Sequence, residues 1–282
     1  MIKIIKYILY FGLFQIVLAQ DKIEEKYTQK NKGKIYFYWG GNRGYFTNSD
    51  ITFSGNNYNI TINNALANDK PKGWNIDYLN PSRMTIPQTN VRIGYFINDK
   101  YSITLGYEHM KYVMAMDQKV SIDGYIDIPS SEGGSIYNGI YNNSEMILKD
   151  DFITFEHTDG LNYINADITR HDDISGWIGH WNTDIFQIQL NEGLGAGFVI
   201  PRTNSTVLNN ANYDEFHLAG FGLSAKAGLT FTFFKHFQIQ TDLKAGYINM
   251  YDVRTTSNAS DRAKHDFWFF QTMIAFGGIF RL

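Results

Sequence analysis

The segment whose spacing comes closest to catalytic chemistry is Phe155-Glu156-His157-Thr158-Asp159. On a strand, residues two positions apart point to the same face, so His157 and Asp159 would lie side by side. A histidine placed in this way beside a serine takes the hydroxyl proton and activates the oxygen for acyl transfer. Here an aspartate stands where that nucleophile would be. We therefore expect a loop-to-strand junction held by local hydrogen bonds, with hydrolysis as the alternative.

A second set of candidate ligands is His171-Asp172-Asp173 together with His180. Imidazole and carboxylate groups could bind a divalent cation, but the same residues in a turn are usually solvated. We expect no metal site and no cofactor. The net charge of −3 gives no reason to expect nucleic acid as a partner, and the absence of cysteine excludes disulfides and thiolate metal sites.

The elements that must carry these residues are strands with two chemically different faces. Within residues 237–248 apolar side chains alternate with Gln238, Gln240, Asp242 and Lys244. A period of two over this length predicts a strand. Residues 223–233 repeat the pattern, and only three residues separate the two segments, which predicts a tight hairpin.

Further alternating segments bring the count to about eight strands, with ten or twelve still open; they lie at residues 34–46, 90–95, 103–108, 162–168, 186–200 and 267–282. The connections between strands are short on one side and long on the other. The long ones are rich in Asn, Ser, Gly and Asp, as solvated loops are, and cover residues 47–86, 115–158, 201–214 and 251–265. Alternation within residues 51–62 suggests that the first of them extends the sheet.

The first nineteen residues have the order of a secretory signal peptide. Basic Lys3 and Lys6 precede an apolar run that ends at the small residue Ala19, where we place cleavage. A retained anchor is the alternative, although the run is shorter than the roughly 20 apolar residues that span a bilayer. Residues 20–32 then form a mobile periplasmic leader, and residues 33–282 form the single folded domain.

The composition favours a sheet that closes within a membrane. After residue 19 no run of apolar residues is long enough to cross as a helix, and aromatic residues make up 16% of the chain, with 19 Tyr and 21 Phe. Aromatic girdles mark both edges of membrane barrels, and only helices and closed barrels satisfy their backbone in lipid. We predict an all-β fold, an antiparallel up-and-down transmembrane barrel exported to the outer membrane. A secreted lipocalin-like or sandwich protein is the soluble alternative.

In a membrane barrel the polar faces of the strands point into the lumen. Five charged residues on those faces are expected to pair there and to close the barrel as a plug: Arg92, Glu108, Lys226, Asp242 and Lys244. Small barrels of eight strands are filled by side chains in this way.

Glu192 departs from this pattern. It follows the parity of Ile188 and Leu190 and so falls among the lipid-facing positions, where a charge costs up to a few kcal/mol near the midplane. We expect a bulge across residues 191–193 to turn Glu192 inward; otherwise the residue is a functional candidate.

The final segment, residues 267–282, is an amphipathic aromatic strand. With the barrel pattern, it makes the chain resemble the small outer-membrane barrels of the OmpA and OmpX type, although the last residue is Leu282 where that family usually has Phe. The resemblance covers residues 33–282 and implies an integral outer-membrane protein without a cofactor. It also implies a structural, adhesion or surface-interaction role through the external loops. The implied partners are outer-membrane lipid, lipopolysaccharide and, through the final strand, the barrel-assembly machinery.

Two other functions stay open. The spacing of His157 and Asp159 is similar to the His and Ser pair that outer-membrane phospholipases and lipid A deacylases carry on one strand, which would make the chain a lipid hydrolase. This chain differs from those enzymes at the nucleophile, because Asp159 stands where they have a serine. A small pore is the third possibility.

Overall fold

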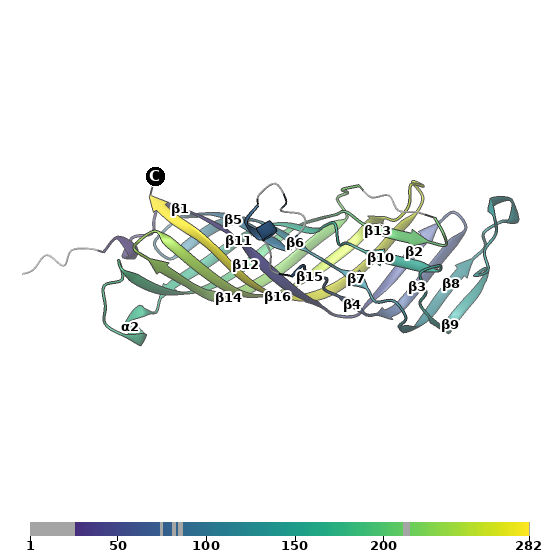
Figure 1. Ribbon diagram of the computed structural model, residues 1–282, viewed down its shortest axis with the longest axis horizontal. Coiled ribbons are helices and arrows are strands. Elements are labelled where there is room, and N and C mark those ends of the chain that lie inside the picture. The colour runs from purple at the N-terminus through teal and green to yellow at the C-terminus, as the bar shows by residue number, and fades with distance from the viewer. Residues whose placement is uncertain (1–25, 74–75, 81–82, 84–86, 211–214, 282) are drawn as a thin grey trace, which may run out of the picture.

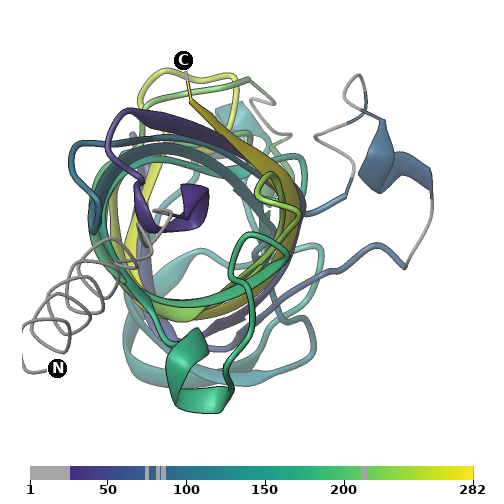
Figure 2. The ribbon, with the colours of Figure 1, turned by 90° about the vertical axis from the view of Figure 1, so that its left-hand side faces the viewer.

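Eight strands close into an antiparallel barrel in the computed structural model, which describes residues 26–73, 76–80, 83, 87–210 and 215–281. The proposed signal peptide, residues 1–19, lies outside the described residues. The strands of the ring are β1 (Lys34–Phe46), β5 (Thr89–Phe96), β6 (Tyr101–Met110), β11 (Leu161–Asp173), β12 (Phe186–Pro201), β14 (Gly220–Phe233), β15 (Phe237–Arg254) and β16 (Arg262–Arg281). They neighbour one another in that order, and β1 pairs with β16 to close the ring. The barrel and its strand count are thus as predicted (Figures 1 and 2).

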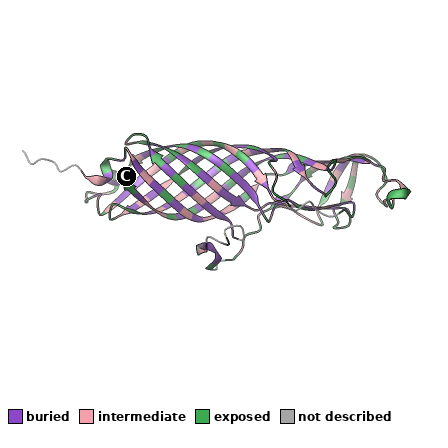
Figure 3. Ribbon diagram, turned by 90° about the horizontal axis from the view of Figure 1, so that it is seen from above, coloured by how far each residue is buried: buried purple, intermediate pink, exposed green. Residues whose placement is uncertain are grey.

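The two faces of the barrel wall differ as the alternation predicts. Polar side chains such as Thr104, Gln240 and Lys244 are buried inside, whereas large apolar side chains are exposed outside, among them Leu105, Leu194, Leu243 and Phe276. Figure 3 shows buried residues alternating with exposed or intermediate ones along the barrel strands that face the viewer. A water-soluble barrel has the opposite polarity, so this exterior suits lipid as its solvent.

The first strand of the ring, β1, has aromatic residues on both faces. Tyr36 and Tyr38 point inward and are 3% exposed, while Phe37 points outward and is 47% exposed. Tyr36 fits inside because Gly94 lies opposite it on β5: a Cβ at Gly94 would come within 2.0 Å of the Tyr36 ring.

Beyond one end of the barrel the sheet continues into an extension. Strand β16 pairs with β2 (Ser49–Gly55), followed in order by β3 (Tyr58–Ala65), β8 (Lys119–Ile126) and β9 (Gly139–Ile147). The expected lengthening of the sheet by residues 51–62 is confirmed. A second sheet of four short strands consists of β4 (Ala67–Asn68), β7 (Val113–Met114), β10 (Ile153–Glu156) and β13 (Asn204–Val207).

The prediction that the long connections are solvated loops is wrong for much of their length. Phe53, Ile60 and Ile62 are fully buried and belong to one apolar cluster with Phe155 and Val207. The connection after β15 is also shorter than expected, because β15 runs to Arg254 and β16 begins at Arg262. These segments fold because their apolar residues have a partner sheet on which to pack.

The opposite end of the barrel holds the short turns, α2 (Ser175–Ile178) and the first described residues. Residues 26–32, expected to be part of a mobile leader, instead fold against the barrel, with η1 (Tyr27–Gln29) seated over its mouth (Figure 2). Asp184 accepts hydrogen bonds from the Thr28 backbone N–H at 3.0 Å and from its hydroxyl at 3.0 Å. Across the described ranges of the chain, no helix is both long and apolar enough to cross a membrane.

Candidate functional site

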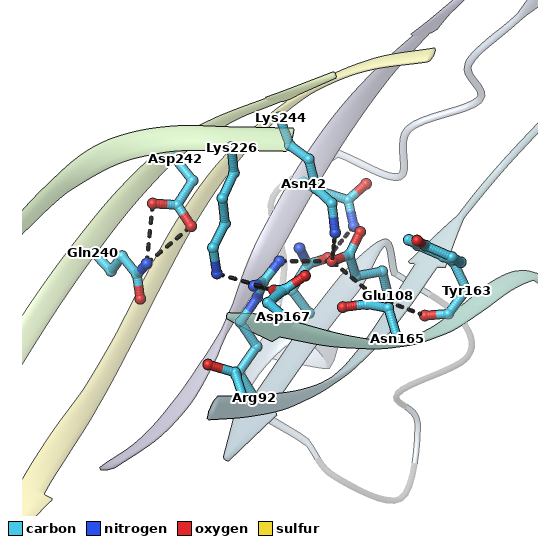
Figure 4. Close-up of polar contacts among 12 residues, drawn as sticks. Asn42, Arg92, Glu108, Tyr163, Asn165, Asp167, Lys226, Gln240, Asp242 and Lys244 are labelled. Carbon is cyan, nitrogen blue, oxygen red and sulfur yellow. Dashed lines mark hydrogen bonds and ion pairs between the residues drawn. The ribbon is translucent and has the colours of Figure 1, made fainter. Parts of the chain in front are cut away.

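A network of charged side chains crosses the lumen, with Arg92 of β5 at its centre (Figure 4). One guanidinium nitrogen, Nη2, donates to Glu108 Oε1 at 2.6 Å, and the other, Nη1, donates to Asp167 Oδ2 at 2.6 Å. All three side chains are at most 2% exposed. Hydrogen bonds between ionised groups are roughly twice as strong as neutral ones, and Arg92 therefore ties β6 and β11 together across the interior.

Two lysines complete the pairing from the far wall. Lys226 of β14 donates to Asp167 Oδ2 at 3.0 Å, and Lys244 of β15 donates to Glu108 Oε1 at 2.6 Å. Each of these two carboxylates is thus paired with Arg92 and with a lysine. Asp242 accepts from Gln240 Nε2 at 2.9 and 3.0 Å. The three cations equal the three carboxylates in number, so the cluster as a whole is neutral.

Glycines on neighbouring strands make room for these carboxylates. Gly195 lies opposite Asp167, and a Cβ there would come within 1.9 Å of Asp167 Oδ1. Gly228 lies opposite Asp242 in the same way, at 2.2 Å from Oδ1. A glycine opposite an inward carboxylate on the neighbouring strand indicates space for that carboxylate. The sequence alone does not show which residues are opposite one another, so this indication depends on knowing the strand register.

The structure brings together Arg92, Glu108, Lys226 and Lys244, and it places Asp242 beside them on Gln240. Asp167 belongs to the same network, although the sequence analysis did not select it. Its parity on residues 162–168 placed it on the polar face, and nothing in the spacing indicated that it bridges Arg92 and Lys226. The result is a cluster of paired charges inside the barrel, and barrels of eight strands are filled by side chains in this way.

The second candidate group is not assembled for acyl transfer. His157 is fully buried, and its Nδ1 lies 3.0 Å from Thr203 Oγ1, while Asp159 is exposed. No hydrogen bond joins His157 to Asp159 in the described part of the chain. The hydrogen bond of His157 is made to Thr203, 46 positions further along the chain, and not to a local partner as expected.

His157 belongs to an aromatic cluster at the junction of barrel and extension. Its ring lies 5.8 Å from that of His265, and Tyr112, Phe155 and Phe267 surround the pair. Both imidazoles lie beyond the apolar band, because Lys264 and Asp266 occupy the outward positions of β16 at this height. Burial, with a smaller contribution from His265, holds the pKa of His157 well below its usual range. Burial lowers the pKa of His265 to about 3.

The expected bulge at Glu192 is absent. Residues 189–201 of β12 pair with β11 without a register shift, and Glu192 stays directly opposite Arg170. Glu192 therefore keeps the outward parity and is exposed on the lipid-facing wall. An outward Arg170 beside it lowers the cost of the charge, which is why the strand needs no bulge.

The candidate metal ligands His171 and His180 do not lie together. His171 lies in β11, is 5% exposed, and bonds Asn191 Oδ1 at 2.8 Å and Ser102 Oγ at 2.9 Å. His180, in contrast, is exposed near α2. Among the residues that the structure describes, no group of three or more His, Asp or Glu side chains is placed to hold a metal ion.

The tip of the extension carries the two most exposed large apolar side chains among the described residues. Ile136 and Ile140 are 87% and 88% exposed, and β9 lies at the edge of the sheet beside β8. None of the nine residues of β9 is buried. Figure 1 shows this hairpin at the end of the molecule farthest from both η1 and the last strand residues.

Comparisons with known proteins give structural neighbours only. No family model and no curated protein matches the chain. The outer membrane protein OprG from Pseudomonas aeruginosa is 11% identical, with 90% of this chain and 99% of that chain covered and a TM-score of 0.41. Neisserial surface protein A is 8% identical, covering 85% and 96%, with a TM-score of 0.30. Ail, the attachment invasion locus protein of Yersinia pestis, is 12% identical, covering 88% and 99%, with a TM-score of 0.29. At these values the fold assignment rests on the strand pairing of this chain itself.

Proposed function

We propose that this chain is an integral outer-membrane protein that displays a rigid interaction platform outside the cell. The observation that carries the proposal is the combination of an apolar barrel exterior with a folded extension at one end only. The barrel anchors the chain in lipid, and the extension holds β8 and β9 clear of the membrane. Export by the signal peptide of residues 1–19 would bring the chain to this location.

Adhesion or another surface interaction suits the extension better than transport does. The charged network fills the lumen, so the barrel supplies an anchor and no path for solutes. The extension has an apolar core that continues into the ring strands, and Tyr137 and Tyr141 beside the exposed tip pack against it. A preorganised surface binds with less loss of conformational freedom than a flexible loop does.

Two kinds of partner follow from the barrel. Outer-membrane phospholipid and lipopolysaccharide would surround the apolar band. The barrel-assembly machinery would recognise β16, whose outward positions carry Trp268, Phe270, Phe276 and Phe280. This strand also closes the ring on β1, and its correct delivery would decide whether the barrel closes.

The experiment compares cells that produce the chain with cells that produce Ile136→Asp/Ile140→Asp. The measurements are self-aggregation and attachment to immobilised extracellular-matrix proteins. We expect the native chain to raise at least one of them severalfold and the double variant to lose the gain. Phe234→Asp, at a position that is 73% exposed at the opposite end of the barrel, serves as the control and should behave as the native chain. Equal aggregation and attachment of producing and non-producing cells would contradict the proposed role.

A further inference from the structure

A charged recess opens on the lipid-facing wall of the barrel, where β6, β11, β12 and β14 lie side by side. It has a volume of about 570 Å³, and its charged lining residues are Glu192, Arg170 and Lys226, of which Lys226 is bonded to Asp167 inside the barrel. Ile168 and Leu194 form apolar walls, while the small residues Gly193, Ala225 and Ala227 form its floor. The recess is therefore a charged site bordered by apolar side chains, which can contact the acyl chains of lipids.

Of the two exposed charged residues in the recess, Arg170 forms an ion pair and Glu192 forms none among the described residues. Arg170 Nε donates to Asp172 Oδ2 at 2.6 Å and Nη2 donates to Asp172 Oδ1 at 3.2 Å. Glu192 makes no hydrogen bond or ion pair with any residue in the described part of the chain. Arg170 lies directly opposite and attracts the Glu192 carboxylate without a hydrogen bond to it. With five N–H donors, Arg170 also keeps donors to spare after its contact with Asp172.

The recess lies near the rim of the apolar band. Arg170 pairs with Tyr101, the first residue of β6, directly after the turn at residues 97–100. Lys100 in that turn lies 3.5 Å from Asp172. A lipid headgroup at this rim can reach Arg170 and Glu192 from the water side, while its acyl chains run along Ile168 and Leu194.

We propose that the recess binds the headgroup of a zwitterionic phospholipid that carries a primary ammonium. The ammonium donates to Glu192, and the phosphate accepts from the free donors of Arg170. The two residues are directly opposite across β11 and β12, which puts their Cβ atoms about 4.5–5.5 Å apart. This spacing suits a phosphate and an ammonium joined by an ethylene linker. The inference rests on the proposed membrane location of the barrel.

The test is native mass spectrometry of the full chain, released from detergent micelles that contain one phospholipid at a time. The probes are dioleoyl phosphatidylethanolamine, the corresponding choline lipid, which has no ammonium N–H to donate, and the glycerol lipid, which has no ammonium. We expect the ethanolamine lipid to be retained about tenfold better than the choline lipid, the effect of one charge-assisted hydrogen bond. Glu192→Gln should abolish this preference, whereas Arg170→Gln should lower the retention of both lipids.

Glu145→Gln, an exposed carboxylate on β9, is the matched control and should keep the preference. Equal retention of ethanolamine and choline lipids by the native chain would overturn the proposal, and so would an unchanged preference in Glu192→Gln. Preferential retention of the glycerol lipid would also overturn the proposal. So would a mass spectrum in which the chain is a dimer and retains all three lipids equally. Migration on a gel with and without boiling keeps this outcome separate from the membrane assignment: a folded barrel migrates faster unboiled whether or not the recess binds lipid.

Discussion

Arg92 is the central residue of the charged network, because among the described residues it is the one that bonds both Glu108 and Asp167. Removing one member of a buried ionic cluster leaves its partners uncompensated, and this costs more than the net stability that the intact cluster supplies. In the described part of the chain, Lys226 reaches only Asp167 and Lys244 reaches only Glu108, so neither lysine bridges the two carboxylates.

Arg92→Met should therefore lower the free energy of unfolding by about 3–5 kcal/mol. Guanidinium unfolding of the detergent-solubilised barrel measures this loss. Arg43→Met, on the neighbouring strand β1 and outside the network, should cost far less. If both variants unfold at the same denaturant concentration as the native chain, the network does not stabilise the barrel.

His157 and His265 predict a loss of stability in acid. Both pKa values lie below the value of about 6.5 for an unfolded chain, so the unfolded state binds more protons as the pH falls below 6.5. Each histidine should then cost up to about 1.4 kcal/mol per pH unit, until its folded pKa is reached. Hydrogen exchange of the extension at pH 7.5 and pH 4.5 measures the effect.

In the variant His157→Gln/His265→Phe, the protection of the extension against hydrogen exchange, relative to the intrinsic exchange rate at each pH, should depend less on pH. The variant lacks both titrating groups. His180→Gln, at an exposed position, should leave the pH dependence unchanged. An extension whose exchange protection is the same at both pH values would show that the buried pair does not control its stability.

Residue positions were predictable from the sequence wherever parity decides them. Arg92 and Lys244 fall on the polar face of their strands by counting alone, but their partners depend on register across the barrel. That is why Asp167 was not selected. The sequence predicted a bulge at Glu192 because a charge on the lipid-facing side of a strand is costly. The residue that offsets this charge, Arg170, lies on the neighbouring strand β11, and the pairing of the two residues depends on register.

Elements at the ends of the barrel carry more structure than their composition indicates. Residues 26–32 are polar and have no period, yet they pack because Asp184 supplies acceptors for Tyr27 and Thr28. Asp184 is in turn 3.3 Å from Lys235, in the turn between β14 and β15. One carboxylate thus joins the N-terminal segment to two turns.

Asp184→Ala should release residues 26–32 from the barrel mouth, since it removes hydrogen bonds worth about 1.5–3 kcal/mol each to a charged acceptor. Limited trypsin digestion reports the release through faster cleavage after Lys30, by roughly tenfold or more. Asp172→Ala, at the same end but on the outer wall, should be cleaved at the native rate. Identical rates for all three proteins would contradict the role of Asp184 as a clamp.

The ring strands were predictable because each has enough residues to show a period of two, whereas the second sheet was not. Its strands β4 and β7 have two residues each, and β10 and β13 have four. Segments this short show no periodicity. The apolar face of residues 51–62 was visible in the sequence, but the surface that buries it was not.

At the scale of the whole molecule, one sheet serves two environments. Its barrel part exposes apolar side chains to lipid, and its extension buries them against a second sheet. The long strands β15 and β16 run through both parts and make them one continuous structure. This continuity holds the tip at a fixed distance from the membrane, which the proposed platform requires.

The orientation of this molecule in the outer membrane is tested most directly by cysteine labelling, since the native chain has no cysteine. Ile136→Cys marks the tip of the extension, and Lys235→Cys marks the turn at the opposite end. Intact cells are treated with a polymer-linked maleimide that is too large to cross the outer membrane. We predict labelling of Ile136→Cys in intact cells and of Lys235→Cys only after the membrane is permeabilised. Equal labelling of both positions in intact cells, or labelling of Lys235→Cys alone, would contradict the account.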